Sequence, residues 1–270
     1  MPKYIEKAEK LTLPVIPTRG LVAFPSIPLN FEVEREFSIA AIDAARECDM
    51  YVFLVCQRSV DCDEPTPADI YETGTVCRIK QTVKTPEGIT RVIAEGVCRG
   101  TAASFTAVGN CMYADVITKT VTLARGESDI RTEALLREAT QSLEHMLSFA
   151  PGDNSDLLLA ARAITNPGQA ADFIASSALV KFEDKQKILE IYEPLARLET
   201  LIVIIESETK LLLLEMNIHK KVREAIDENQ RDYYLREQIH AIREELGEDD
   251  TDEEDYDGKI RALKLPEETE

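Results

Sequence analysis

Residues 195–246 read LARLETLIVIIESETKLLLLEMNIHKKVREAIDENQRDYYLREQIHAIREEL, and this stretch contains neither proline nor glycine. Because these two residues are the usual helix breakers, their absence permits one continuous helix. At about 1.5 Å per residue, such a helix reaches roughly 80 Å, which exceeds the width of a compact domain of this size. We therefore expect the helix to project from a folded body and to connect a recognition module to a larger machine.

Two apolar patches lie along this helix, separated by the polar residues 227–232. Apolar residues spaced by three and four positions share one helix face. Because the heptads are not sustained, the pattern favours docking at two places over one long coiled coil. We predict that Ile239, Ile242 and Leu246 form an oligomerisation or docking stripe. The patches comprise Leu211, Leu214, Ile218, Val222 and Ala225 in the first, and Leu235, Ile239, Ile242 and Leu246 in the second.

Residues 1–120 are expected to form a β-rich recognition domain. Short runs of β-branched and aromatic residues predict strands, and Thr85-Pro86-Glu87-Gly88 is typical of a hairpin turn. Helical spacing over residues 38–48 predicts a helix with Ser38 as its N-cap. The segment Thr66–Asp69 predicts a capped helix of about one turn. The pattern indicates a barrel-like or sandwich domain. The predicted strands cover residues 50–56, 75–83, 89–97 and 111–117.

Residues 121–193 are expected to form a small helical bundle, because their apolar residues change to helical spacing. Asn166-Pro167 is typical of a helix start, with asparagine as the cap and proline in the first turn. The long helix follows over residues 194–247, and residues 248–270 form a predicted acidic linker. The fold class is therefore α+β. The bundle helices are predicted at residues 133–149, 156–164, 170–179 and 183–192.

The charge balance excludes several classes of partner. The chain has a formal net charge of −19, and 44% of its residues are hydrophobic. Nucleic acids and anionic membrane surfaces require clustered lysine and arginine, so neither is an expected partner. No run of 18 apolar residues occurs that could span a membrane. The first residues resemble no export signal, and no cysteine pair has CxxC spacing, so we expect a reduced, cytoplasmic protein.

Motifs for catalysis or metal binding are absent from the sequence. It contains no GxxxxGK[ST], GxSxG or HExxH pattern, so no catalytic residue is predicted. Residues 253–264 match only the first half of a calcium loop, because Lys264 replaces the carboxylate needed at the last position. We therefore expect neither a metal nor a cofactor in this chain. The ending after residues 266–268 interrupts a helical pattern, which suggests a fragment of a longer protein.

Two apolar segments are candidates for contact with a protein substrate. Phe24-Pro25-Ser26-Ile27-Pro28 is a proline-stiffened loop, in which Phe24 could either fill the β core or join Ile27 and Pro28 on a contact surface. Tyr233, Tyr234 and Leu235 pose the same choice on the long helix. Adjacent helical side chains diverge by about 100°, so one tyrosine should face outward unless a partner covers it. The alternatives here are an interface and docking within the chain.

Several blocks together resemble the Lon ATP-dependent protease family (endopeptidase La). The resemblance covers nearly the whole chain, and the blocks occur in the family's order. They are residues 13–20 (LPVIPTRG), Phe24-Pro25, residues 38–41 (SIAA), residues 63–75 (DEPTPADIYETGT), residues 166–175 (NPGQAADFIA) and residues 230–248 (QRDYYLREQIHAIREELGE).

The resemblance implies a PUA-like β barrel, a helical bundle and a long helix at the N-terminus of a homohexameric ring protease. Such a region would recognise misfolded and regulatory proteins and help to assemble the hexamer. The family's AAA+ ATPase, with its ATP and Mg²⁺, and its Ser–Lys protease domain are missing from this chain, so no catalytic residue can be carried over. The alternatives are a free-standing protein-binding adaptor and, by analogy with PUA-like folds alone, an RNA-binding protein, which the negative charge disfavours.

Overall fold

The computed structural model describes residues 4–86, 88–123, 130–150, 152 and 154–246. The chain divides into two compact units, Met1–Leu212 and Leu213–Glu270. The β strands, the shorter helices and the N-terminal part of the last helix belong to the first unit. The acidic segment and the partial calcium loop predicted beyond residue 247 lie outside the described residues.

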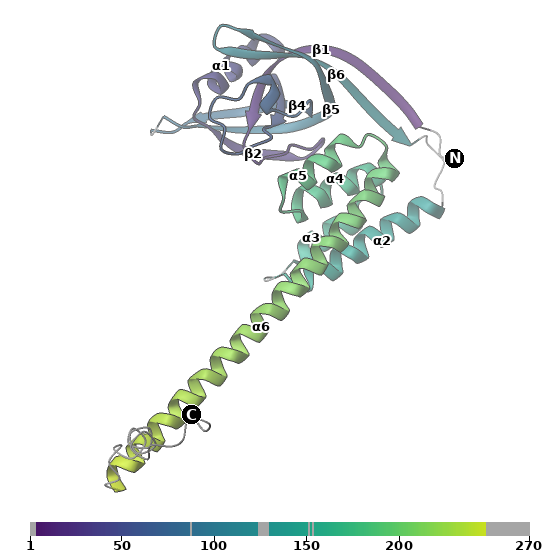
Figure 1. Ribbon diagram of the computed structural model, residues 1–270. Helices are drawn as coiled ribbons and strands as arrows, with labels where there is room; N and C mark the ends of the chain where they lie inside the picture. The colour runs from purple at the N-terminus through teal and green to yellow at the C-terminus, as the bar shows by residue number, and fades with distance from the viewer. Residues whose placement is uncertain (1–3, 87, 124–129, 151, 153, 247–270) are drawn as a thin grey trace, which may run out of the picture. The chain divides into compact units, whose positions relative to one another are not determined.

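A closed β barrel with one additional strand forms the larger part of the first unit (Figure 1). The strand order is β2-β5-β4-β3-β1-β6, and a further pairing of β5 with β6 closes the ring. One side of β5 pairs with β4, whereas its other side is shared between β2 at residues 90–95 and β6 at residues 100–108. Among the described strands, β2 therefore has only β5 as a neighbour. The strands are β1 Tyr4–Thr18, β2 Pro28–Val33, β3 Tyr51–Cys56, β4 Thr73–Lys84, β5 Thr90–Val108 and β6 Cys111–Leu123.

The prediction of a β-rich N-terminal part is confirmed, but the sequence pattern identifies only four of its strands. β3, β4, β5 and β6 overlap the predicted runs, whereas β1 and β2 were not predicted. Prolines at positions 14, 17 and 28 interrupt the pattern of both missed strands. Most of β1 pairs with β6 about a hundred positions away, for example Leu11 with Val116, so local sequence carries little of the signal.

The sequence predicted two short helices in the barrel region, and the predicted cap is confirmed for only one of them. Helix α1 spans Glu36–Ala44 with Arg35 at its N-cap position, so the prediction that Ser38 caps this helix is wrong. Ser38 lies inside the first turn and is 2% exposed. The 3₁₀ helix η1, Ala45–Cys48, follows α1 directly. The predicted cap at Thr66 is confirmed in the 3₁₀ helix η2, Pro67–Asp69, where the Thr66 N–H and Oγ1 both donate to Asp69 Oδ2 (2.9 and 2.6 Å).

The shorter helices pack with the start of the last helix around a shared apolar core (Figure 1). Leu143, Ile174, Leu189 and Leu198 come from four different helices, and each is at most 1% exposed. The predicted helix start at Asn166 is confirmed, because Asn166 Oδ1 accepts from the Gln169 N–H (3.0 Å). The helices are α2 Ile130–Leu147, α3 Ser155–Ala163, α4 Pro167–Ala178 and α5 Phe182–Glu190.

The last helix, α6, is unbroken from Pro194 to Leu246, which confirms the predicted long helix. Its buried residues begin at Pro194 and end at Thr209, within the first unit. In the second unit, every described residue from 214 onward is exposed. Within the first unit, a mixed sheet is joined to segregated helices, so the α+β class is also confirmed. Among the described residues, no helix combines the length and the apolar character that crossing a bilayer requires.

A buried charge network joins the barrel to the helices inside the first unit. Asp172 on α4 accepts from Arg99 Nη1 on β5 (2.9 Å) and from Arg99 Nη2, and both of its oxygens accept from Arg197 Nη1 on α6 (3.1 Å each). Arg99 Nε donates to the Leu189 carbonyl (3.0 Å), and Arg197 Nη2 donates to the Tyr192 carbonyl (3.0 Å). The three charged side chains are at most 6% exposed. Burial lowers the pKa of Arg197 to about 10, and the neighbouring Arg99 charge adds to this effect.

Candidate functional site

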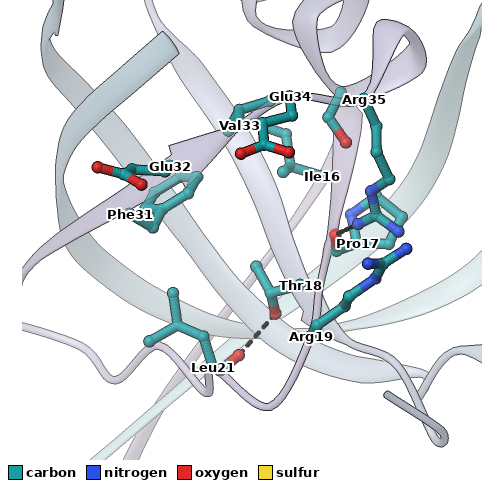
Figure 2. Close-up of a pocket in the computed structure, with 11 residues that line it drawn as sticks. Ile16, Pro17, Thr18, Arg19, Leu21, Phe31, Glu32, Val33, Glu34 and Arg35 are labelled. Carbon is teal, nitrogen blue, oxygen red and sulfur yellow. Dashed lines mark hydrogen bonds between the residues drawn. The ribbon is translucent and has the colours of Figure 1, made fainter. Parts of the chain in front are cut away.

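A groove of about 310 Å³ lies between the C-terminal part of β1 and the strand β2 (Figure 2). β6 pairs with β1 only as far as Pro14, and residues 15–18 of β1 pair with β3 on the other side. No described strand therefore fills the space between residues 15–18 and β2. The groove is lined by Ile16, Pro17, Thr18, Arg19, Leu21, Phe31, Glu32, Val33, Glu34, Arg35 and Ser38.

The basic side of the groove is held in place by internal hydrogen bonds. Arg35 Nη1 donates to Gln57 Oε1 (2.7 Å), and Arg35 Nη2 donates to the Pro17 carbonyl. Arg19 Nη2 donates to Asp63 Oδ1. Figure 2 shows both guanidinium groups gathered beside Pro17. Burial lowers the pKa of Arg35, and the nearby charge of Arg19 lowers it further. Both arginines therefore serve mainly to fix this wall of the groove.

The acidic side of the groove contains one carboxylate without a counter-charge. Glu32 Oε1 accepts from Arg91 Nη2 (2.7 Å) and Arg91 Nε (3.1 Å). Glu34 is exposed and has no ionic or hydrogen-bonding partner among the described residues. Both arginines of the opposite wall are held by hydrogen bonds, although the partners of Arg35 are neutral and leave its charge in the groove. Among the charged groups that line the groove, Glu34 is therefore the one without a hydrogen-bonding or ionic partner among the described residues.

Apolar surface and one unsatisfied hydroxyl complete the groove. Leu21 and Phe31 are half-buried, so part of each side chain remains accessible. The loop that carries Leu21 is fixed because Thr18 Oγ1 donates to the Leu21 carbonyl (2.6 Å). Ser38 is 2% exposed, and its Oγ has no hydrogen-bond partner among the described residues. The Oγ is itself buried, so this hydroxyl lies beneath the groove surface and offers no accessible hydrogen-bonding group.

The side chains around the groove suit non-covalent binding. No cysteine or histidine lines it, and the hydroxyl of its serine has no hydrogen-bond partner among the described residues that could act as a base. Elsewhere, burial raises the pKa of Cys56 to about 11 and also raises the pKa of Cys77, so neither thiol is activated. Within the described part of the chain, no group of three or more His, Cys, Asp or Glu residues could hold a metal ion.

A second cavity, of about 150 Å³, lies at the junction of barrel and helices. Its charged lining includes Arg99, Asp172 and Arg197, whose groups bond to one another and to backbone carbonyls. Gly168 packs closely against this network, because an added Cβ would lie 3.3 Å from Arg197 Nη1 and the guanidinium would have to shift by a few tenths of an ångström. These residues connect the two halves of the first unit, and the groove beside β2 is the better candidate for a binding site.

The residues predicted to contact substrate occupy different environments. Phe24 is 1% exposed, so it is a core residue and not a surface contact, but the core in which it packs is shared with the helices and is not the β core that the alternative named. Ile27 is half-buried against the same core. Pro28 is exposed at the start of β2, but neither Ile27 nor Pro28 lines the groove.

The candidates on α6 are all exposed and belong to the second unit. Tyr233 and Tyr234 are 67% and 62% exposed, and Tyr234 Oη accepts from Gln238 Nε2 (3.1 Å). The remaining members are Leu235 (44%), Ile239 (51%), Ile242 (57%) and Leu246 (68%). The sequence reasoning missed the groove residues Arg19, Leu21, Phe31, Glu34, Arg35 and Ser38, although the alternation of Leu29, Phe31 and Val33 could have predicted β2.

Comparison with known proteins places these observations in context. Residues 12–207 match the family described as the ATP-dependent protease La (LON) substrate-binding domain. The chain is 35% identical over 264 residues to a Lon protease of Bacillus thuringiensis (strain Al Hakam), covering 95% of this chain and 32% of that protein. It is 34% identical over 266 residues to a Lon protease of Clostridium acetobutylicum, covering 96% of this chain and 34% of that protein.

The solved structures give a similar result for the fold. The N-terminal domain of a Mycobacterium avium complex Lon protease superimposes with a TM-score of 0.59 at 18% identity, covering 73% of this chain and 98% of that one. The chain spans about a third of the length of the curated relatives it matches. The match over residues 12–207 includes the groove, the shorter helices and the barrel apart from the first part of β1.

Proposed function

Because this chain belongs to the ATP-dependent protease La (LON) substrate-binding domain family, we propose that it captures protein substrates for an ATP-dependent protease of which it forms the N-terminal region. The observation that carries this proposal is the family match over residues 12–207, which contains the whole groove beside β2. The groove combines accessible apolar surface with a free strand edge. Those features suit a polypeptide that exposes apolar side chains and unpaired backbone groups.

The chemistry of proteolysis belongs, in this proposal, to parts of a longer protein outside this chain. ATP and Mg²⁺ would bind to an ATPase module, and peptide cleavage would occur in a protease domain, in the cytoplasm. The net charge of −19 supports protein over nucleic acid as the partner. Assembly into a hexamer would multiply weak binding sites, so affinity for unfolded segments could rise through avidity without strong sequence preference.

The exposed residues of α6 supply further contacts in this proposal. Tyr233, Tyr234 and Leu235 would contact substrate, and the stripe Ile239, Ile242 and Leu246 would bind another subunit or dock on a neighbouring module. Their exposure, between 44% and 68%, supports a role that requires accessible apolar surface. Ile27 and Pro28 remain proposed contacts on the barrel.

Binding of an unfolded model protein tests the proposed function. Fluorescence anisotropy of a labelled, permanently unfolded protein should rise on addition of the chain, whereas the natively folded form of the same protein should give no change. Serine substitutions at Ile27, Tyr233, Tyr234 and Leu235 should weaken capture. The proposal is wrong if the chain fails to bind the unfolded form or binds both forms equally.

A free-standing adaptor is the second candidate, and the gene distinguishes it. A reading frame that continues into a GxxxxGK[ST] motif after residue 270 supports the protease. A stop codon directly after residue 270 supports the adaptor.

A further inference from the structure

The free edge of β2 presents unpaired backbone groups to the groove. The Gly96 N–H donates to the Ile27 carbonyl (3.2 Å), and the pairing of β2 with β5 continues from there without a register shift. Hydrogen-bonded and non-hydrogen-bonded positions alternate along an antiparallel pair, so Asn30 and Glu32 direct their N–H and C=O groups away from β5. No described residue bonds to these groups. The β2 positions bonded to β5 are then Leu29, Phe31 and Val33.

The opposite wall of the groove cannot pair in the same way. Pro17 has no N–H, and its carbonyl already accepts from Arg35 Nη2. Arg35 is fixed in turn by Gln57, which is fully buried. An extended chain entering the groove would therefore find backbone partners on β2 and only side chains on the β1 wall.

Charge and shape restrict the kind of segment that fits. A volume of about 310 Å³ is at the lower end of ligand pockets and would hold an apolar side chain or two between Leu21 and Phe31. Glu34 is exposed and has no partner among the described residues, whereas Arg35 is held by Gln57 and the Pro17 carbonyl, so a lysine or arginine of the bound segment would pair with Glu34. The net charge of −19 works in the same direction over longer distances.

We propose that an extended polypeptide segment, apolar with a neighbouring basic residue, binds as an added strand along the free edge of β2. Its backbone pairs with Asn30 and Glu32, its apolar side chains lie against Leu21 and Phe31, and its basic residue pairs with Glu34. This inference rests on the proposed function and specifies its substrate class. Strand addition gives affinity through the backbone, which explains how one site accepts many sequences.

A labelled synthetic peptide tests the strand geometry without changing the protein. The probe is a short apolar peptide with one lysine, and its affinity for the full chain is measured by fluorescence anisotropy. N-methylation at alternate residues removes the donors that face one side of a strand. One alternate set should weaken binding about tenfold, and the other set should leave it unchanged, because each lost hydrogen bond contributes a similar modest amount. Equal effects of both sets would overturn strand addition.

Protein variants test the edge and the charge separately. Asn30→Pro removes one outward N–H and should weaken probe binding severalfold while retaining a cooperative melting transition. Glu34→Gln should abolish a roughly fivefold preference for the lysine probe over its glutamate counterpart. Glu36→Gln, a change at an exposed position outside the groove, is the matched control and should keep that preference. If Asn30→Pro does not fold, the methylated probes decide the backbone question.

The outcomes separate this inference from the proposed function. Binding of the unfolded model protein together with insensitivity to N-methylation and to Glu34→Gln would refute strand addition and leave substrate capture intact. Absence of binding by both the unfolded protein and the peptide probes would refute the proposed function itself.

Discussion

Asp172→Asn should destabilise the first unit strongly. The substitution keeps the size and shape of the side chain but removes the negative charge that faces Arg99 and Arg197. Both arginines are at most 6% exposed, so their charges would remain buried without a counter-ion. Removing one partner of a buried ion pair costs about 3–5 kcal/mol. For a unit of about two hundred residues, this corresponds to a fall of roughly 6–20 °C in the melting temperature.

Urea titration followed by circular dichroism measures the loss, and the surface pair of Arg162 and Glu144 provides the matched control. These side chains are 53% and 52% exposed, and their atoms lie 2.7 Å apart. Glu144→Gln should therefore cost less than about 1 kcal/mol. Replacing Arg99, Asp172 and Arg197 together by Met, Leu and Met should recover part of the stability lost in Asp172→Asn. Equal midpoints for Asp172→Asn and Glu144→Gln would show that the buried network does not hold barrel and helices together.

Three further results follow from the structure. Gly96→Ala should lower the free energy of unfolding by about 1–3 kcal/mol, because the new Cβ would clash with the Phe24 carbonyl. Urea titration measures this loss, and an unchanged midpoint would show that the loop carrying Phe24 shifts freely. Iodoacetamide at about pH 8 should label Cys56 and Cys77 only after denaturation, because burial raises the pKa of both thiols. Mass spectrometry measures the labelling, and labelled Cys56 or Cys77 in the native chain would contradict this burial. Ile239→Glu should shift sedimentation toward the monomer if the stripe on α6 joins copies of the chain, and an unchanged profile would exclude that contact.

The features that the sequence predicted best depend on neighbouring residues. The long helix was predictable because proline and glycine are absent from residues 195–246, and α6 extends without a break from Pro194 to Leu246. The cap at Thr66 was predictable because Asp69 lies one turn away in the sequence. The start of α4 at Asn166 depended on the same kind of local signal.

The groove was not predictable because it is assembled from segments that meet only in the closed barrel. Residues 16–21 and 31–35 become neighbours because β5 divides one side between β2 and β6. The prolines at positions 14, 17 and 28 made β1 and β2 difficult to predict from the sequence pattern, and these two strands border the groove. The position of Phe24 was not predictable for the same reason. Its loop sequence fitted either a core or a surface role, and Phe24 is buried because the helices pack against it.

Hydrogen exchange at individual backbone amides reports whether a bound polypeptide pairs with the free edge of β2. The amides of Asn30 and Glu32 on the free edge of β2 should exchange rapidly in the free chain. A saturating unfolded protein should slow exchange at these two amides and leave the amides already bonded to β5 little changed. Protection confined to residues 213–246, or no protection anywhere in the chain, would contradict strand addition at this edge.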